Sequence, residues 1–142
     1  MKWIECLADL IFPRKCEICG RLLTGDERYI CEDCMEDMPL TYYWDWPENP
    51  AEKKLWVRTH LHRVIPLFFY TRESRYITLI HKIKYQGKAH LGHHMGFMLG
   101  EKLRGVLSDV DYVVPIPLHP IRRWRRGYNQ AEIIAGGVTE AL

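Results

Sequence analysis

The spacing of the cysteines is the feature that most restricts how this chain can fold. Four of its five cysteines lie in the stretch CEICGRLLTGDERYICEDC, residues 16–34, as two Cys-x-x-Cys pairs. Two intervening residues let both sulfurs of a pair face one ion, and two such pairs complete a tetrahedral site with Zn–S distances of about 2.3 Å. Because the protein fills all four positions, the site is closed and structural. The predicted zinc ligands are Cys16, Cys19, Cys31 and Cys34.

Three other uses of paired cysteines fit this sequence less well. Two disulfides would require an oxidising compartment, and the N-terminal stretch WIECLADLIF is too short and too acidic for a secretory signal. A thioredoxin-like motif needs one Cys-x-x-Cys near a βαβ pattern, and an iron–sulfur cluster, although chemically open, usually has tighter or less even spacing. Cys6 lies outside the pattern, on the apolar face of a helix predicted over residues 3–11, and we interpret it as a buried thiol.

Charge divides the chain into an acidic and a basic part. Residues 1–52 contain 5 Lys and Arg against 12 Asp and Glu, a net charge of −7, whereas residues 53–142 contain 15 against 6, a net charge of +9. The basic part is the candidate for phosphate or nucleic-acid contact, and a solvated lysine-rich surface is the alternative. No apolar run approaches the length of about 18 residues that a membrane span needs, so we expect a soluble, cytoplasmic protein.

The hydrophobic pattern after the cysteines predicts an α/β fold. Apolar residues recur with helical spacing in three segments, and two further runs have the composition of buried strands. The predicted helices cover 75–86, 89–104 and 129–142, and the predicted strands cover 63–71 and 109–118. This order is typical of the first part of an α/β domain. The stretch 39–50, rich in proline and aromatic residues, is predicted as an irregular linker whose rings pack on a neighbour; a base-stacking platform is the alternative.

A cluster of arginines follows the second predicted strand. The stretch VVPIPLHPIRRWRRGYNQAEIIA, residues 113–135, places them in a Pro-x-Pro loop between that strand and the last predicted helix. Ligands of open α/β sheets bind beyond the carboxyl ends of the strands, and guanidinium groups match phosphate oxygens bidentately. We interpret the cluster as an anion-binding site; a solvated surface cluster, or nucleic-acid binding with stacking on Trp124, is the alternative. Its members are Arg122, Arg123, Arg125 and Arg126.

Several stretches of the sequence together resemble the ComF family of competence-associated proteins. They are DLIFPRKCEICG, the paired cysteines, IHKIKYQGK and VPIPLHPIRRWRRGYNQAEIIA, and the last is the most specific. Tyr128 stands where many members carry Phe. The resemblance implies an N-terminal four-cysteine zinc-finger module over residues 1–50, with its helix and aromatic linker. It also implies part of a type I phosphoribosyltransferase-like α/β domain with a parallel sheet over residues 51–142.

The resemblance further implies a function in DNA uptake and natural transformation. Single-stranded DNA would be the macromolecular ligand, and phosphoribosyl pyrophosphate (PRPP) with Mg²⁺ would be the small one. The competence machinery, with a helicase-like protein, would be the partner. Six residues match the family's motifs and become candidate contacts to phosphate or nucleic acid: Lys84, Arg122, Arg123, Arg125, Arg126 and Asn129.

One departure from the family pattern bears on activity. The chain has no Asp-Asp-x-x-Thr-Thr-Gly stretch, with which type I phosphoribosyltransferases hold the ribose hydroxyls and the 5′-phosphate. We therefore expect these 142 residues to lack the C-terminal part of the domain and to have no transferase activity of their own. The alternative function is a non-catalytic, zinc-containing module that binds nucleic acid or protein.

Overall fold

The computed structural model describes residues 13–142, which divide into two compact units. The first unit contains the described residues up to Met38 together with Tyr70–Ile80, and the second contains Pro39–Phe69 and His81–Leu142. The helix predicted over residues 3–11, with Cys6, lies outside the described residues. The division into domains at residue 50 that the sequence suggests stays a prediction.

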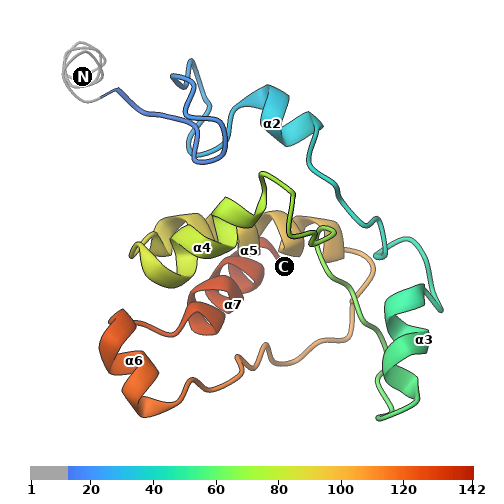
Figure 1. Cartoon of the computed structure of the whole chain (residues 1–142). Coiled ribbons are helices and arrows are strands. Elements are labelled where there is room, and N and C mark those ends of the chain that lie inside the picture. The colour runs from blue at the N-terminus through green and yellow to red at the C-terminus, as the bar shows by residue number, and fades with distance from the viewer. Residues whose placement is uncertain (1–12) are drawn as a thin grey trace. The chain divides into compact units, whose positions relative to one another are not determined.

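Secondary structure in the described residues is helical (Figure 1). The helices are α2 (Glu32–Glu36), α3 (Pro50–Trp56), α4 (Ile77–Tyr85), α5 (Ala89–Leu103), α6 (Pro120–Arg126) and α7 (Gln130–Ala141). The β structure within residues 13–142 consists of two isolated antiparallel bridges, one between Lys15 and Leu22 and one between Leu40 and Phe68. Among these helices, none has the length and apolar character that crossing a membrane requires.

The expected α/β domain with a parallel sheet is wrong, because no sheet forms within residues 13–142. The predicted strand 63–71 is broken by Pro66 and pairs only at Phe68. The predicted strand 109–118 contains Pro115 and Pro117, which lack a donor for strand pairing. A strand is stable only when a neighbour completes its backbone hydrogen bonds, and no other segment of the described chain does so here.

The three helices predicted from apolar periodicity are confirmed as α4, α5 and α7, within a few residues at their ends. α5 and α7 lie side by side (Figure 1) and pack closely because glycines of each helix meet the backbone of the other. A Cβ atom at Gly96 would lie 2.0 Å from the carbonyl oxygen of Ile134, and one at Gly137 would lie 2.0 Å from that of His93. Because no side chain larger than hydrogen fits at these points, the two backbones are in direct contact.

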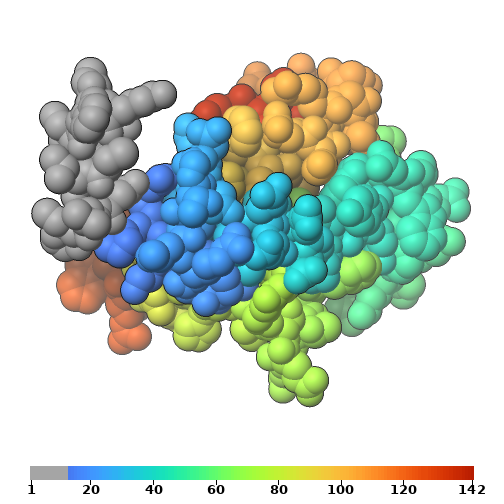
Figure 2. Space-filling view, turned by 90° about the horizontal axis from the view of Figure 1, so that it is seen from above, coloured from blue at the N-terminus to red at the C-terminus, as the bar shows by residue number. Residues whose placement is uncertain are grey.

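α3 was not predicted, although it begins with a complete capping box. The side chain of Asn49 accepts hydrogen bonds from the amides of Ala51 and Glu52, and the carboxylate of Glu52 accepts from the amide of Asn49. Pro50 occupies the first helical position, where its missing N–H costs nothing. α3 lies at the surface in the space-filling view (Figure 2), and Glu52 faces inward, where it is 1% exposed.

The buried carboxylate of Glu52 is neutralised by Arg63. The Nε atom of Arg63 donates to it at 2.9 Å, and the same guanidinium donates to the carbonyl oxygens of Tyr43 and Trp44. Burial opposes ionisation of Glu52, but hydrogen bonds from the Val64 amide and Arg63 outweigh it and lower its pKa. This ion pair therefore links α3 to the aromatic stretch that precedes it.

That aromatic stretch packs against its own unit, as the linker prediction expects. Tyr43 and Trp44 are buried. The ring of Tyr43 makes edge-to-face contacts with Trp46 and Phe69 at centroid distances of 5.7 Å. The ammonium of Lys102 lies 5.9 Å from the Trp44 ring centroid. The geometry favours ring packing over the base-stacking alternative for the two buried rings.

Candidate metal centre and arginine cavity

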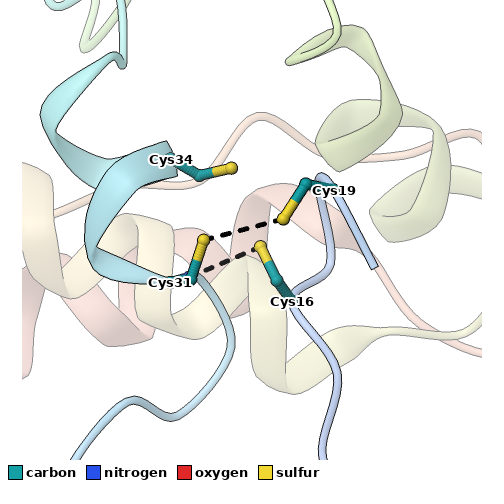
Figure 3. A group of neighbouring side chains, drawn as sticks. All are labelled: Cys16, Cys19, Cys31 and Cys34. Carbon is teal, nitrogen blue, oxygen red and sulfur yellow. Dashed lines mark hydrogen bonds between the residues drawn. The ribbon is translucent and has the colours of Figure 1, made fainter. Parts of the chain in front are cut away.

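The first cysteine pair lies on a tight turn closed by backbone hydrogen bonds. The amide of Cys16 donates to the carbonyl of Arg21 at 2.7 Å, and the amide of Gly20 donates back to the carbonyl of Cys16 at 3.0 Å. Gly20 has φ of +77°, which side-chain-bearing residues rarely adopt. The turn lets Cys16 and Cys19 direct their sulfurs to the same side (Figure 3).

The second pair uses the start of a helix instead of a turn. Cys31 is the N-cap residue of α2, and Cys34 lies in the first turn of that helix. Cys31 makes no side-chain cap to the helix, so its thiol is available to the cluster. The amide of Cys31 donates to Sγ of Cys16 at 3.4 Å, which ties the two pairs together.

The four sulfurs form a compact cluster with the donor set of a zinc site. All four lie within 4.8 Å of one another, and Sγ of Cys19 is 3.6 Å from Sγ of Cys31 (Figure 3). Tetrahedral coordination at Zn–S distances of about 2.3 Å sets sulfurs about 3.8 Å apart, so the outermost sulfurs would close by about 1 Å on a bound ion. Cys16, Cys31 and Cys34 are buried, and Cys19 is exposed. These residues could hold a structural zinc ion.

The thiols of the cluster differ in how readily they ionise. Burial raises the pKa of Cys16, but hydrogen bonds from the amides of Cys19, Cys31 and Ile18 outweigh it and lower this pKa to about 6. Burial raises the pKa of Cys34, and its neighbouring thiols raise it further. One sulfur is therefore a ready thiolate, and a divalent cation would favour the ionised form of the others.

Glu27 caps α2 in place of Cys31. Its carboxylate accepts from the amides of Thr24 and Glu32, both at 2.7 Å, and Arg21 donates to it at 3.3 Å. The hydrogen bond from the Thr24 amide, followed by that from Glu32, lowers the pKa of Glu27. Arg21 also pairs with Asp33 on the exposed side of α2. Glu27 thus joins the loop between the cysteine pairs to the helix that carries the second pair.

A segment distant in the sequence completes the surroundings of the cluster within the first unit. The hydroxyl of Tyr76 donates to the carbonyl oxygen of Cys34 at 2.9 Å, and Tyr76 is buried. Its neighbour Arg75 pairs with Asp37 at 2.7 Å. These contacts fix the C-terminal part of α2 and so the backbone of the fourth cysteine.

The second unit contains a cavity of about 540 Å³ with a strongly basic lining. α4 contributes Lys84 and Tyr85, and α6 contributes three of the predicted arginines. The guanidinium of Arg126 lies over the Tyr85 ring, 5.3 Å from its centroid. The residues that line the cavity are Lys84, Tyr85, Gly87, Arg122, Arg125 and Arg126.

Two of the six predicted phosphate contacts, Arg123 and Asn129, do not line this cavity. Arg123 is exposed and pairs with Glu132 at 3.2 Å, and it is not among the residues that line the cavity. Asn129 is 2% exposed because it caps α7 through the Ala131 amide and donates to the carbonyl of Ile116. The arginines also belong to a helix, α6, rather than to the expected loop.

Sequence reasoning missed three residues that shape these sites. Glu27 could have been found from the Thr-x-x-Glu spacing of a capping box, and Tyr85 directly follows the predicted Lys84. Tyr76 carries no local signal, because its partner Cys34 lies 42 residues earlier in the chain.

Comparison with known proteins bears on the cysteine-rich end of the chain. Residues 7–43 match the double zinc ribbon domain family. No curated protein and no solved structure matches the chain. The match and the cluster of four cysteines together support a zinc ribbon domain in this part of the chain. The resemblance to the ComF family rests on the sequence motifs alone.

Proposed function

We propose that this protein is a non-catalytic, zinc-containing binding module that holds single-stranded nucleic acid through the basic cavity of its second unit. In this proposal the zinc ion stabilises the ribbon and takes no part in chemistry, because four cysteines would fill its coordination sphere. The basic cavity is the observation that carries the proposal.

The cavity lining combines the two kinds of group that bind single strands. Arg122, Arg125 and Lys84 supply positive charge for backbone phosphates, and the Tyr85 ring, 64% exposed, offers a face on which an unpaired base can stack. Trp124, 85% exposed on α6, offers a second such face. Residues 53–142 carry a net charge of +9, which favours a polyanion over a neutral ligand.

The resemblance to the ComF family gives this binding a biological setting, the handling of single-stranded DNA during uptake. In that setting a helicase-like protein of the competence machinery would deliver the strand. PRPP is a second candidate ligand, because its pyrophosphate group, accompanied by Mg²⁺, would meet the same guanidinium groups. No transfer reaction forms part of the proposal.

Fluorescence anisotropy with a labelled oligothymidine across a series of salt concentrations tests the proposal. We expect binding that weakens with salt, with a slope of about −0.7 for each phosphate neutralised. Replacing Arg125 and Arg126 together by alanine should reduce the affinity roughly tenfold and the slope by about 1.4. PRPP with Mg²⁺, added as a competitor, tests the second ligand.

The matched control is Arg58→Ala, which removes a charge of the same kind from an exposed position of the same unit outside the cavity. We expect it to leave the affinity within about twofold of the original protein. Equal losses for the control and the cavity variant, or equally tight binding of duplex DNA, would contradict the proposal.

A further inference from the structure

Cys19 is the residue of the metal centre that solvent reaches most readily. It is exposed, whereas Cys16, Cys31 and Cys34 are buried. A Cβ atom at the neighbouring Gly20 would meet nothing within 4 Å, so the space beside Cys19 is open as well. A small dissolved reagent therefore meets the cluster first at Cys19.

The backbone amides that contact the cluster donate to other sulfurs. Sγ of Cys16 accepts from the amides of Ile18 and Cys31 at 3.5 Å and 3.4 Å. Sγ of Cys31 accepts from the amide of Cys34. Within residues 13–142, no backbone amide donates to Sγ of Cys19, whose sulfur contacts that of Cys31. Hydrogen bonds that stabilise a thiolate also make it less nucleophilic, so the sulfur of Cys19 keeps more of its reactivity.

A bound zinc ion would remove differences in protonation among the four sulfurs, because a coordinating thiol is held as a thiolate. Access and intrinsic nucleophilicity then decide which sulfur reacts. Both favour Cys19 over Cys16 and Cys31, and access favours it over Cys34. Exposed thiolates beside a second cysteine are the ones that oxidants modify selectively.

Cys31 is placed to react with an oxidised Cys19. Their Sγ atoms lie 3.6 Å apart, in contact across the two cysteine pairs (Figure 3). A disulfide is about 2 Å long, so these sulfurs need to approach each other by only about 1.5 Å. Cys16 accepts two amide hydrogen bonds and is the weaker nucleophile of the neighbouring pair.

We propose that Cys19 is an oxidation site, at which a peroxide converts the metal centre into a disulfide between Cys19 and Cys31. The thiolate of Cys19 attacks one oxygen of hydrogen peroxide, the O–O bond breaks, and hydroxide leaves a sulfenic acid on Cys19. The thiolate of Cys31 then attacks this sulfur and a second hydroxide leaves as the S–S bond forms. The two sulfurs lose the two electrons that the peroxide gains.

The oxidation would exchange one cross-link of the ribbon for another. A disulfide would join the turn of the first cysteine pair to the start of α2, and only Cys16 and Cys34 would remain as zinc ligands. Two sulfurs are half of the ligand set of a structural zinc site, so we expect the ion to be released. The proposal does not depend on the nucleic-acid function proposed above.

Release of zinc by hydrogen peroxide from the complete, zinc-loaded chain tests the proposal. A chromogenic chelator that is too weak to remove the ion by itself reports the rate. Cys19→His keeps a fourth ligand of a kind that zinc accepts and should slow the release about tenfold, because the reactive thiolate is gone. The matched control is Cys6→Ser, which removes the one thiol outside the cluster and should change the rate less than about twofold. Equal rates for the two variants, or zinc that peroxide leaves bound in the original protein, would overturn the proposal.

Peptide mapping of the oxidised original protein locates the bond and needs no variant to fold. Trypsin cleaves after Lys15, Arg21 and Arg28, so each cysteine pair lies on a peptide of its own. A disulfide between Cys19 and Cys31 joins these two peptides, lowers their summed mass by two hydrogens, and is placed by fragment ions. A bond within one pair, or a first N-ethylmaleimide adduct on a cysteine other than Cys19, would refute the assignment.

Discussion

At the scale of single residues, the metal centre depends on the carboxylate of Glu27, which is not one of the four predicted zinc ligands. An N-cap side chain normally accepts a hydrogen bond from the first turn of its helix, but the thiol of Cys31 faces the other cysteines. Glu27 supplies the missing acceptor to the Glu32 amide. The cysteine at the helix start can therefore serve the cluster without leaving the helix uncapped.

Replacing Glu27 by alanine should weaken zinc binding about tenfold, because groups that orient metal ligands typically change affinity by this order. Competition with a chromogenic chelator measures the effect. Asp26→Ala is the control, because it removes the same charge from an exposed side chain one residue away. Equal zinc affinities for the two variants would show that Glu27 does not position the cluster.

At the scale of elements, contact between α5 and α7 is set by glycine. Gly137 leaves no space for a methyl group, because its Cβ would lie 2.0 Å from a backbone oxygen. The preceding Gly136 would meet only the side chain of His93, at 3.7 Å. A methyl group therefore has space at Gly136 but not at Gly137, because Gly137 lies on the face of α7 that meets α5.

Gly137→Ala should destabilise the protein by about 1–3 kcal/mol, because the added methyl forces the helices apart. Gly136→Ala should have the opposite sign and stabilise it by up to about 1 kcal/mol through the higher helix propensity of alanine. Urea unfolding followed by circular dichroism measures both. Similar stabilities for the two variants would contradict direct backbone contact between the helices.

The sequence predicted these elements unevenly, for a physical reason. Helices satisfy their backbone hydrogen bonds locally, so apolar periodicity was sufficient for α4, α5 and α7. A strand needs a partner that its own sequence does not specify, and the apolar runs at 63–71 and 109–118 therefore remained irregular. α3 was missed because the prolines of its neighbourhood were interpreted as a linker, although Asn49 and Glu52 have the spacing of a capping box.

The candidate sites were also predicted unevenly, because spacing within a short stretch can be interpreted directly, whereas contacts between distant segments cannot. The four cysteines are close in sequence, so their spacing alone was sufficient to predict the cluster. The cavity brings Lys84 together with arginines of α6, which lie far from it in the sequence. The resemblance to family motifs suggested these residues as phosphate contacts but did not show that they line one cavity. Asn129 was predicted to contact phosphate because it matches a motif of the family. In the structure its side chain caps α7, and this contact satisfies hydrogen bonds that a buried amide needs.

At the scale of the whole molecule, the chain contains two units that differ in what holds them together. Within the described residues, the first contains the cysteine cluster, whereas the second has helices packed through α5 and α7. Small modules commonly depend on a metal because burial alone stabilises them too little. Structural zinc contributes on the order of 10 kcal/mol or more to such modules near neutral pH.

Removal of zinc by a strong chelator should therefore unfold the first unit before the second. Elemental analysis should find about one zinc per chain beforehand. Hydrogen exchange should then show lost protection in residues 13–38 and 70–80, while the amides of α5 and α7 stay protected. Absence of metal from the purified protein, or simultaneous loss of protection in both units, would contradict this expectation.

The hydrogen bond from Tyr76 to Cys34 has a consequence for how this zinc ribbon could be transplanted. A graft of residues 13–43 into another protein would carry every cysteine of the cluster but would leave behind the tyrosine that holds the last of them. The ribbon sequence therefore does not contain every residue that holds its cysteines in place. A host protein would have to provide an equivalent hydroxyl of its own.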